Sequence, residues 1–245
     1  MKLCIVIPNY NHGDKIAAVV DSLSFLNLAI IIVDDGSDLP TQQKIAAVAQ
    51  QYADVEVVTH AVNQGKGGAV MTGMKKASEL GFSHMLQVDA DGQHDISNCE
   101  KLIELAKTHP QQIISGLPIY DDSIPLGRRF SRHITHFWVW VETLSFSIKD
   151  TMCGFRIYPL PPCIELMARQ PLGTRMDFDI EVMVRLYWSG TSTRFLPTKV
   201  IYPEDGISHF QPVADNVRIT WMHTRLFFGM LTRIPSLLKR QGDSS

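Results

Sequence analysis

Short apolar runs alternate with amphipathic stretches over the first half of the chain. Five runs have the length of buried strands, at Leu3–Ile7, Ala29–Val33, Val55–Thr59, Met85–Val88 and Gln112–Ser115. Four stretches between them carry apolar residues at helical spacing, at Ile16–Phe25, Gln42–Tyr52, Gly68–Leu80 and Ser97–Thr108. This alternation is typical of βαβ units, so the pattern predicts an α/β fold with a mostly parallel central sheet flanked by helices.

The second half of the chain has a less regular pattern. Pro118–Ile148 resembles an insertion with an aromatic helix around Phe137–Trp140, and Thr151–Tyr158 is expected to form a strand that the following prolines end. The remaining expected elements are a helix at Asp177–Trp188, short strands at Ser192–Leu196 and Val200–Tyr202, and a long helix at Asn216–Leu238. No linker marks a second domain. We therefore expect one domain over residues 1–215, with a C-terminal amphipathic helix and tail over 216–245.

Polar residues cluster where the predicted strands end. They are Asn9 to Asn11, Asp34 with Asp35, Asn63 to Gly67, and Asp89 to Gln93. Open parallel sheets bind ligands outside the carboxyl ends of their strands, so this edge is the candidate site.

Two acidic turns fall at that edge. In LQVDADGQH, Asp89 and Asp91 stand two residues apart after a strand and can share one hard cation such as Mg²⁺ or Mn²⁺, which prefers oxygen ligands. The alternative interpretation is an Asx turn. The second turn, Asp34-Asp35-Gly36-Ser37, has a structural alternative too, a helix N-cap by Ser37 or Asp38.

A glycine-rich segment, NQGKGGAV (Asn63–Val70), precedes one predicted helix and contains Lys66. Backbone amides at a helix start favour anions. The segment is not a Walker A loop, because no Ser or Thr follows the lysine. The alternative is a flexible helix entry with a solvated lysine.

Composition narrows the class of protein. The 245 residues are 45% hydrophobic and carry a net charge of −2, which indicates a globular protein and argues against a nucleic-acid partner. The 4 cysteines include no C-x-x-C pair, so reduced structural cysteines are expected. The first strand begins almost at Met1 and no run of 18 apolar residues occurs, so we expect a cytoplasmic protein.

Four motifs in order resemble glycosyltransferase family 2, the inverting GT-A enzymes. They are VIPNYN (Val6–Asn11), VDDGS (Val33–Ser37), NQGKGGAV (Asn63–Val70) and DADGQH (Asp89–His94). DTMCGFRIY (Asp150–Tyr158) extends the resemblance toward the dolichol-phosphate mannosyltransferase-like branch.

The resemblance implies a Rossmann-like GT-A fold, a UDP- or GDP-linked sugar as donor, and Mg²⁺ or Mn²⁺ as cofactor. Donor-binding roles would fall to Pro8, Tyr10 and Asn11 (nucleoside pocket), Asp34 and Asp35 (base or ribose), Lys66 (nucleotide) and Asp89 (ribose or metal). Asp91 would bind the metal, and Gln93 or the late His209 would complete its shell. A metal stabilises the diphosphate that leaves the sugar.

The acceptor side leaves two alternatives open. A hydroxyl acceptor needs a carboxylate base, for which Asp150 is the first candidate and Asp179 the second, with Asp177 and Glu181 nearby. These last three acids also suit a helix N-terminus. A polyprenyl-phosphate acceptor needs no base, and arginines would bind it, namely Arg128, Arg129, Arg132 and Arg156. A solvated basic face is the alternative for those arginines. The branch usually has a basic residue after Ser208, where this chain has His209.

An apolar stripe in the last predicted helix carries basic residues around it. Its members are Trp221, Leu226, Phe227, Phe228, Met230, Leu231, Ile234 and Leu238. Such a helix either packs on the core or lies on the inner face of a membrane as a peripheral contact.

The sequence thus predicts a metal-dependent inverting hexosyltransferase with a lipid-linked or membrane-proximal acceptor. The alternatives are transfer to a saccharide hydroxyl in envelope glycan synthesis and a non-catalytic nucleotide-sugar-binding protein. A sugar-phosphate nucleotidyltransferase would need a glycine-rich loop with Arg and Lys after the first strand, and PNYNHG (Pro8–Gly13) contains neither basic residue.

Overall fold

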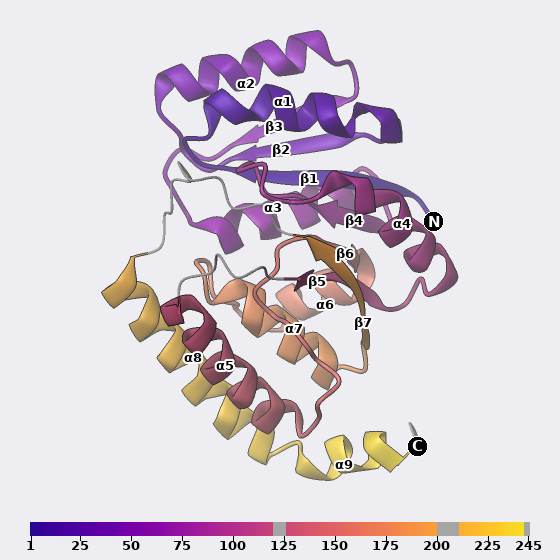
Figure 1. The fold of residues 1–245 in the computed structure, drawn as a ribbon, viewed down its shortest axis with the longest axis vertical. Coiled ribbons are helices and arrows are strands. Elements are labelled where there is room, and N and C mark those ends of the chain that lie inside the picture. The colour runs from indigo at the N-terminus through magenta and orange to yellow at the C-terminus, as the bar shows by residue number, and fades with distance from the viewer. Residues whose placement is uncertain (120–125, 200–210, 243–245) are drawn as a thin grey trace.

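Strands from both halves of the chain form one central sheet (Figure 1). The computed structural model describes residues 1–119, 126–199 and 211–242. Within them the strands are β1 (Leu3–Asn9), β2 (Ile30–Asp34), β3 (Val55–Thr59), β4 (His84–Gln87), β5 (Ile113–Ile119), β6 (Arg156–Pro159) and β7 (Thr193–Lys199). Their order in the sheet is β3-β2-β1-β4-β6-β5-β7. Only β6 runs antiparallel to its neighbours among these strands, so the predicted mostly parallel sheet is confirmed.

Helices cover both faces of the sheet. They are α1 (Gly13–Leu23), α2 (Leu39–Gln51), α3 (Lys66–Glu79), α4 (Cys99–Thr108), α5 (Leu126–Thr143), α6 (Leu160–Arg169), α7 (Phe178–Trp188), α8 (Pro212–Leu231) and α9 (Ile234–Gly242), with short 3₁₀ turns at Ser24–Leu26 and Ile96–Asn98. α5 and α8 lie side by side along one edge of the molecule (Figure 1). No helix in the described part of the chain is both long and apolar enough to cross a bilayer.

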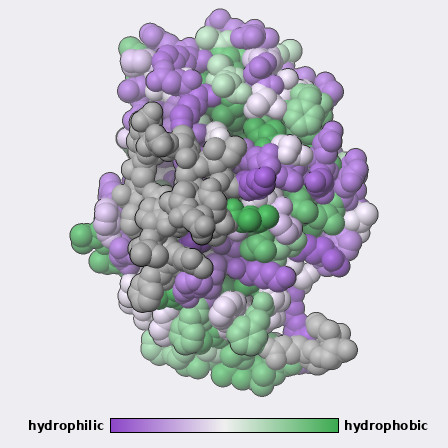
Figure 2. Space-filling view, in the orientation of Figure 1, coloured by the Kyte–Doolittle hydropathy of each residue, from purple (hydrophilic) through white to green (hydrophobic). Residues whose placement is uncertain are grey.

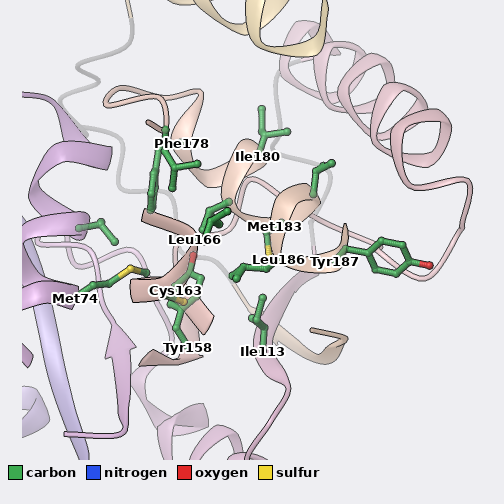
Figure 3. Close-up of a cluster of buried hydrophobic side chains, with 14 of the residues drawn as sticks. Met74, Ile113, Tyr158, Cys163, Leu166, Phe178, Ile180, Met183, Leu186 and Tyr187 are labelled. Carbon is green, nitrogen blue, oxygen red and sulfur yellow. The ribbon is translucent and has the colours of Figure 1, made fainter. Parts of the chain in front are cut away.

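Alternate residues of the strands enter two different cores. Ile5 and Ile7 of β1 join the core beneath α1, α2 and α4, whereas Val6 joins the core beneath α3, α6 and α7. Figure 3 shows the second core, where Met74 of α3 and Tyr158 of β6 pack with side chains of α6 and α7. Because both faces are covered, the strands read as continuous apolar runs.

Glycines bring α3 close to its neighbours. A Cβ on Gly73 would lie 2.3 Å from Cγ1 of Val6, and a Cβ on Gly67 would lie 2.4 Å from Cβ of Phe178. Part of the glycine-rich segment is therefore explained by packing. These close approaches fix the N-terminus of α3 against α7 and the middle of α3 against the sheet.

Three of the expected elements differ in the structure, and prolines explain two of the differences. The strand expected at Thr151–Tyr158 begins only at Arg156, and Pro161 and Pro162 start α6 rather than a loop, because proline is tolerated in the first helical turn. The helix expected at Asn216–Leu238 is two helices. Pro235 cannot donate a hydrogen bond to the carbonyl of Leu231, so α8 ends there and α9 begins. Val200–Tyr202 lies outside the described residues.

Candidate active site

A buried lysine stands at the centre of the candidate site. Lys66, the first residue of α3, places its Nζ 2.8 Å from Oδ2 of Asp89 and 3.2 Å from Oδ2 of Asp179. Asp89 follows β4, and Asp179 lies in the first turn of α7. Three segments far apart in sequence therefore meet at one cation.

The carboxylates control the protonation of this cluster. Burial alone would lower the pKa of Lys66, but the charges of Asp179 and Asp89 outweigh burial and raise it. Burial would likewise raise the pKa of Asp89, whereas Lys66 and His94 outweigh that effect and lower it. The cluster is thus charged at neutral pH, with Lys66 an ammonium and Asp89 a carboxylate.

Arg156 lies beneath the cluster and is fully buried. Its Nη1 donates to the main-chain oxygen of Asp179 at 3.0 Å and to the hydroxyl of Tyr158 at 3.1 Å, and its Nε donates to Ser115 at 3.3 Å. The guanidinium therefore supports the start of α7 from inside the core.

Gly154 allows the loop before β6 to approach this cluster. A Cβ at this position would lie 2.5 Å from Oδ2 of Asp89 and 2.8 Å from Nζ of Lys66. Next to it, the ring of Phe155 stacks on His94 with centroids 5.1 Å apart. His94 Nε2 is 3.4 Å from Oδ2 of Asp89. The motif DADGQH contained His94, but its spacing alone did not indicate this contact.

The same loop begins with a second buried ionic cluster. Asp150 pairs with Arg132, and its Oδ2 is 3.4 Å from Nε2 of His136. Its Oδ1 accepts hydrogen bonds from the backbone N–H groups of Met152 (2.9 Å) and Cys153 (2.8 Å). Burial would raise the pKa of Asp150, but His136 and Arg132 outweigh it and lower the pKa to about 2. Asp150 is therefore a weakly basic carboxylate that holds two side chains of α5.

The acidic turn after β2 is heavily hydrogen-bonded. Asp35 accepts hydrogen bonds at 2.8 Å from the backbone N–H groups of Gln64 and Gly65, and its Oδ1 is 2.7 Å from Nδ1 of His60. Asp35 therefore fixes the turn that leads into Lys66. Asp38 caps α2 by accepting from the backbone N–H of Thr41, as the N-cap alternative expected.

The candidate nucleoside-pocket residues lie beside that turn. Pro8 is buried in β1 opposite Val33, and Tyr10 is half-buried. Asn11 has a positive φ of 55°; its backbone N–H donates to Ser37 at 2.9 Å, and its Oδ1 accepts from the N–H of Asp38 at 2.9 Å. Asp34 is buried and accepts from the N–H of Ser37 at 3.3 Å. These contacts tie the loops after β1 and β2 together.

The metal set expected from sequence is only partly described. Asp91 Oδ1 accepts from the N–H of Gln93 at 3.0 Å, which is the Asx-type turn, and His209 lies outside the described residues. No group of three or more His, Cys, Asp and Glu side chains within the described ranges could hold a metal by itself. A magnesium-type ion bound through one or two carboxylates and substrate phosphates still fits Asp91 and Asp89.

Two further acids have structural partners. Glu181 is fully buried, pairs with Arg185 and accepts from the N–H of Gly173 at 2.7 Å. Asp177 accepts from the N–H of Arg175 at 3.1 Å at the start of α7.

The sequence analysis did not predict a role for Arg175. Its Nη1 donates to Asn63 at 2.6 Å and so holds the turn before Lys66 in place. Arg128 lies in α5, but its side chain is not among the described ones.

A cavity of about 350 Å³ lies between α5 and α8. Its lining is mostly apolar and comprises Ile134, Thr135, Trp138, Met152, Asn216, Ile219, Thr220, His223, Thr224 and Phe227. Met152 connects the cavity to the ionic cluster, because its N–H binds Asp150. We call this cavity the α5–α8 groove.

Comparison with known proteins identifies the family. The model of glycosyl transferase family 2 matches residues 4–175. The chain belongs to this family. The glycosyltransferase family expected from the four motifs is therefore confirmed, and the predicted GT-A fold is confirmed with it.

Sequence relatives include dolichyl-phosphate transferases. The mouse dolichyl-phosphate β-glucosyltransferase is 28% identical over 205 residues, which are 74% of this chain and 62% of that protein. The UDP-N-acetylglucosamine–dolichyl-phosphate N-acetylglucosaminyltransferase of Methanococcus voltae is 26% identical over 82% of this chain and 86% of its own. The chain thus spans less than two thirds of the glucosyltransferase. Neither name points to the mannosyltransferase branch suggested by Asp150–Tyr158.

Solved structures share the fold. A mannosyltransferase from Pyrobaculum calidifontis in complex with GDP-Man and Mn²⁺ superposes with a TM-score of 0.62 at 14% identity, covering 100% of this chain and 76% of its own. Glucosyl-3-phosphoglycerate synthase from Mycobacterium tuberculosis gives 0.63 at 17% identity, covering 95% and 79%.

Proposed function

We propose that this glycosyltransferase moves a hexose, with inversion and with help from a divalent metal, from a nucleotide-diphosphate sugar to the phosphate of a membrane lipid. The observation that carries the acceptor assignment is the state of Asp150. A carboxylate with a pKa of about 2, bound by Arg132, His136 and two backbone amides, is a poor proton acceptor. A phosphate acceptor is already anionic and needs no base.

The donor assignment rests on the edge of the sheet where Lys66 lies. Its ammonium group and the turn fixed by Asp35 favour the diphosphate, and Asp91 with Asp89 would hold the metal on it. The metal would supply positive charge to the leaving diphosphate. Lys66 keeps Asp89 and Asp179 in place, and Arg156 acts as a positioning residue because it is fully buried under Asp179.

The acceptor phosphate would meet α5. Arg132 carries a guanidinium group that pairs with Asp150, and guanidinium groups pair well with phosphates. The α5–α8 groove opens beside this cluster through Met152 and offers a mostly apolar lining to the lipid. The names of the sequence relatives agree with a lipid-phosphate acceptor and make UDP-linked glucose and N-acetylglucosamine the first donors to test, before GDP-mannose.

The test is transfer of labelled sugar with Mn²⁺ from each donor to three acceptors: a polyprenyl phosphate, the matching polyprenol, and a saccharide. We expect product only with the phosphate. Transfer to the polyprenol or to the saccharide hydroxyl would contradict the assignment and would return Asp150 or Asp179 to the role of base. Nucleotide-sugar binding without any transfer would instead leave the protein as a binding module.

A further inference from the structure

An aromatic bridge joins α5 to α8 inside the α5–α8 groove. The ring of Trp138 contacts Phe227 edge to face, with centroids 6.2 Å apart, and lies 6.5 Å from the ring of His223. All three side chains line the groove. Trp138 and Phe227 are the last lining residues of α5 and α8 along the chain. Met152 instead lies beside Asp150, which pairs with Arg132, six residues before Trp138. These rings therefore make up the aromatic end of the lining, which we call the aromatic wall.

A buried polar pair reinforces this wall. His223 Nδ1 is 2.7 Å from Oε1 of Glu142, whose side chain is fully buried. His223 Nε2 has no hydrogen-bond partner within the described residues. Burial of a polar atom against hydrocarbon is unfavourable, so a lipid chain gains nothing by passing His223. The apolar lining of the groove thus ends where the polar pair and the two aromatic rings lie.

The volume of the groove limits what it holds. A water molecule takes up roughly 30 Å³ of liquid volume, and we use this figure for one heavy atom of a bound chain. The cavity of about 350 Å³ therefore accommodates about a dozen heavy atoms. For a polyprenyl chain built from five-carbon units, that is two or three units next to the phosphate.

We propose that Trp138, Phe227 and His223 form a stop at the end of the groove. This stop limits how many isoprenoid units of the acceptor lipid contact the enzyme. The proposal rests on the proposed function, because it places the acceptor chain in the α5–α8 groove. The two or three isoprenoid units nearest the phosphate determine acceptor recognition. Further units lie beyond the stop and add no affinity through this groove.

The experiment measures KM and kcat for a series of prenyl phosphates with one to six isoprenoid units, below their micellar concentrations and without membranes. For the wild-type enzyme we expect KM to fall about tenfold or more with each unit up to the second or third, since buried methylene groups contribute favourably, and then to stay constant. In Phe227→Ala the constant region of KM should begin about one unit later.

Trp221→Ala is the matched control. Trp221 is an α8 side chain that is 62% exposed and does not line the groove, so the chain-length profile of this variant should equal that of the wild type. If Phe227→Ala lowers the melting temperature too far for assay, Phe227→Leu and Trp138→Leu provide smaller changes in the same wall.

The outcomes separate this inference from the proposed function. The stop is overturned if the wild-type KM keeps falling through six units, or if every wall variant has the wild-type profile. In either case, transfer to prenyl phosphates still supports the proposed function. Absence of transfer to every prenyl phosphate overturns both.

Discussion

At the scale of single residues, two glycines allow effects on activity to be distinguished from effects on stability. In Gly154→Ala the new Cβ would meet Asp89 and Lys66 at 2.5 and 2.8 Å, so we expect kcat/KM to drop more than about tenfold with a small change in melting temperature. In Gly73→Ala the Cβ would meet Val6 at 2.3 Å. Overpacking costs about 1–3 kcal/mol. This variant should therefore melt earlier but keep the activity of its folded fraction. Donor kinetics and thermal melts on both variants check the contrast, and equal effects in the two would refute it.

Sequence predicted the positions of site residues best where the two partners belong to consecutive motifs. Lys66 and Asp89 were placed at one edge because their strands and helix are consecutive, and they are 2.8 Å apart. The partners of Asp150 could not be read in the same way. Arg132 lies 18 residues upstream in a segment that resembled an insertion, and only the i,i+4 spacing of Arg132 and His136 on one helix face hinted at a shared ligand.

At the scale of elements, the turn after β4 should carry the metal dependence. Asp91 accepts from the N–H of Gln93 within the turn and does not contact the Lys66 cluster. Asp91→Ala should therefore remove the proposed metal ligand and leave that cluster intact. We expect turnover stimulated by Mn²⁺ to be lost and the unfolding temperature without metal to stay within a few degrees of the wild type. Titration of Mn²⁺ against activity, with melts in EDTA, measures both quantities. Wild-type stimulation by Mn²⁺ in this variant would remove Asp91 from the metal site.

The hydrophobic pattern predicted element boundaries well, except near prolines, and it did not predict strand direction. Val55–Thr59 was predicted to the residue because both ends of β3 change composition sharply. The start of α6 was missed since Pro159, Pro161 and Pro162 look like a loop until their place in the first helical turn is known. The antiparallel direction of β6 was also missed, because a run of apolar residues does not indicate in which direction the strand will run in the sheet.

At the scale of the whole molecule, the apolar stripe of α8 faces two ways. Met222, Leu226 and Met230 are buried against the core, which confirms part of the packing interpretation. Trp221 is 62% exposed, and Leu231 and Leu238 are also exposed. Figure 2 shows hydrophobic residues gathered at the end of the molecule where α8 meets α9. The sequence predicted the stripe but not its division, since which face is covered depends on α5 and α7.

This exposed face predicts binding to a lipid surface. Large exposed apolar side chains on an amphipathic helix, with Lys239 and Arg240 in the last turn of α9, suit an anionic membrane. Replacing Trp221 and Leu231 together by Ser should reduce co-sedimentation with vesicles containing anionic lipid several-fold and leave transfer to a short soluble prenyl phosphate unchanged. The matched control replaces Phe25 and Leu39, which are 50% and 66% exposed near α1 and α2, and should bind vesicles like the wild type. Equal vesicle binding by both double variants would contradict a membrane contact through the exposed α8 side chains. A loss of binding only in the α8 variant would place the α5–α8 groove next to the bilayer that supplies its lipid.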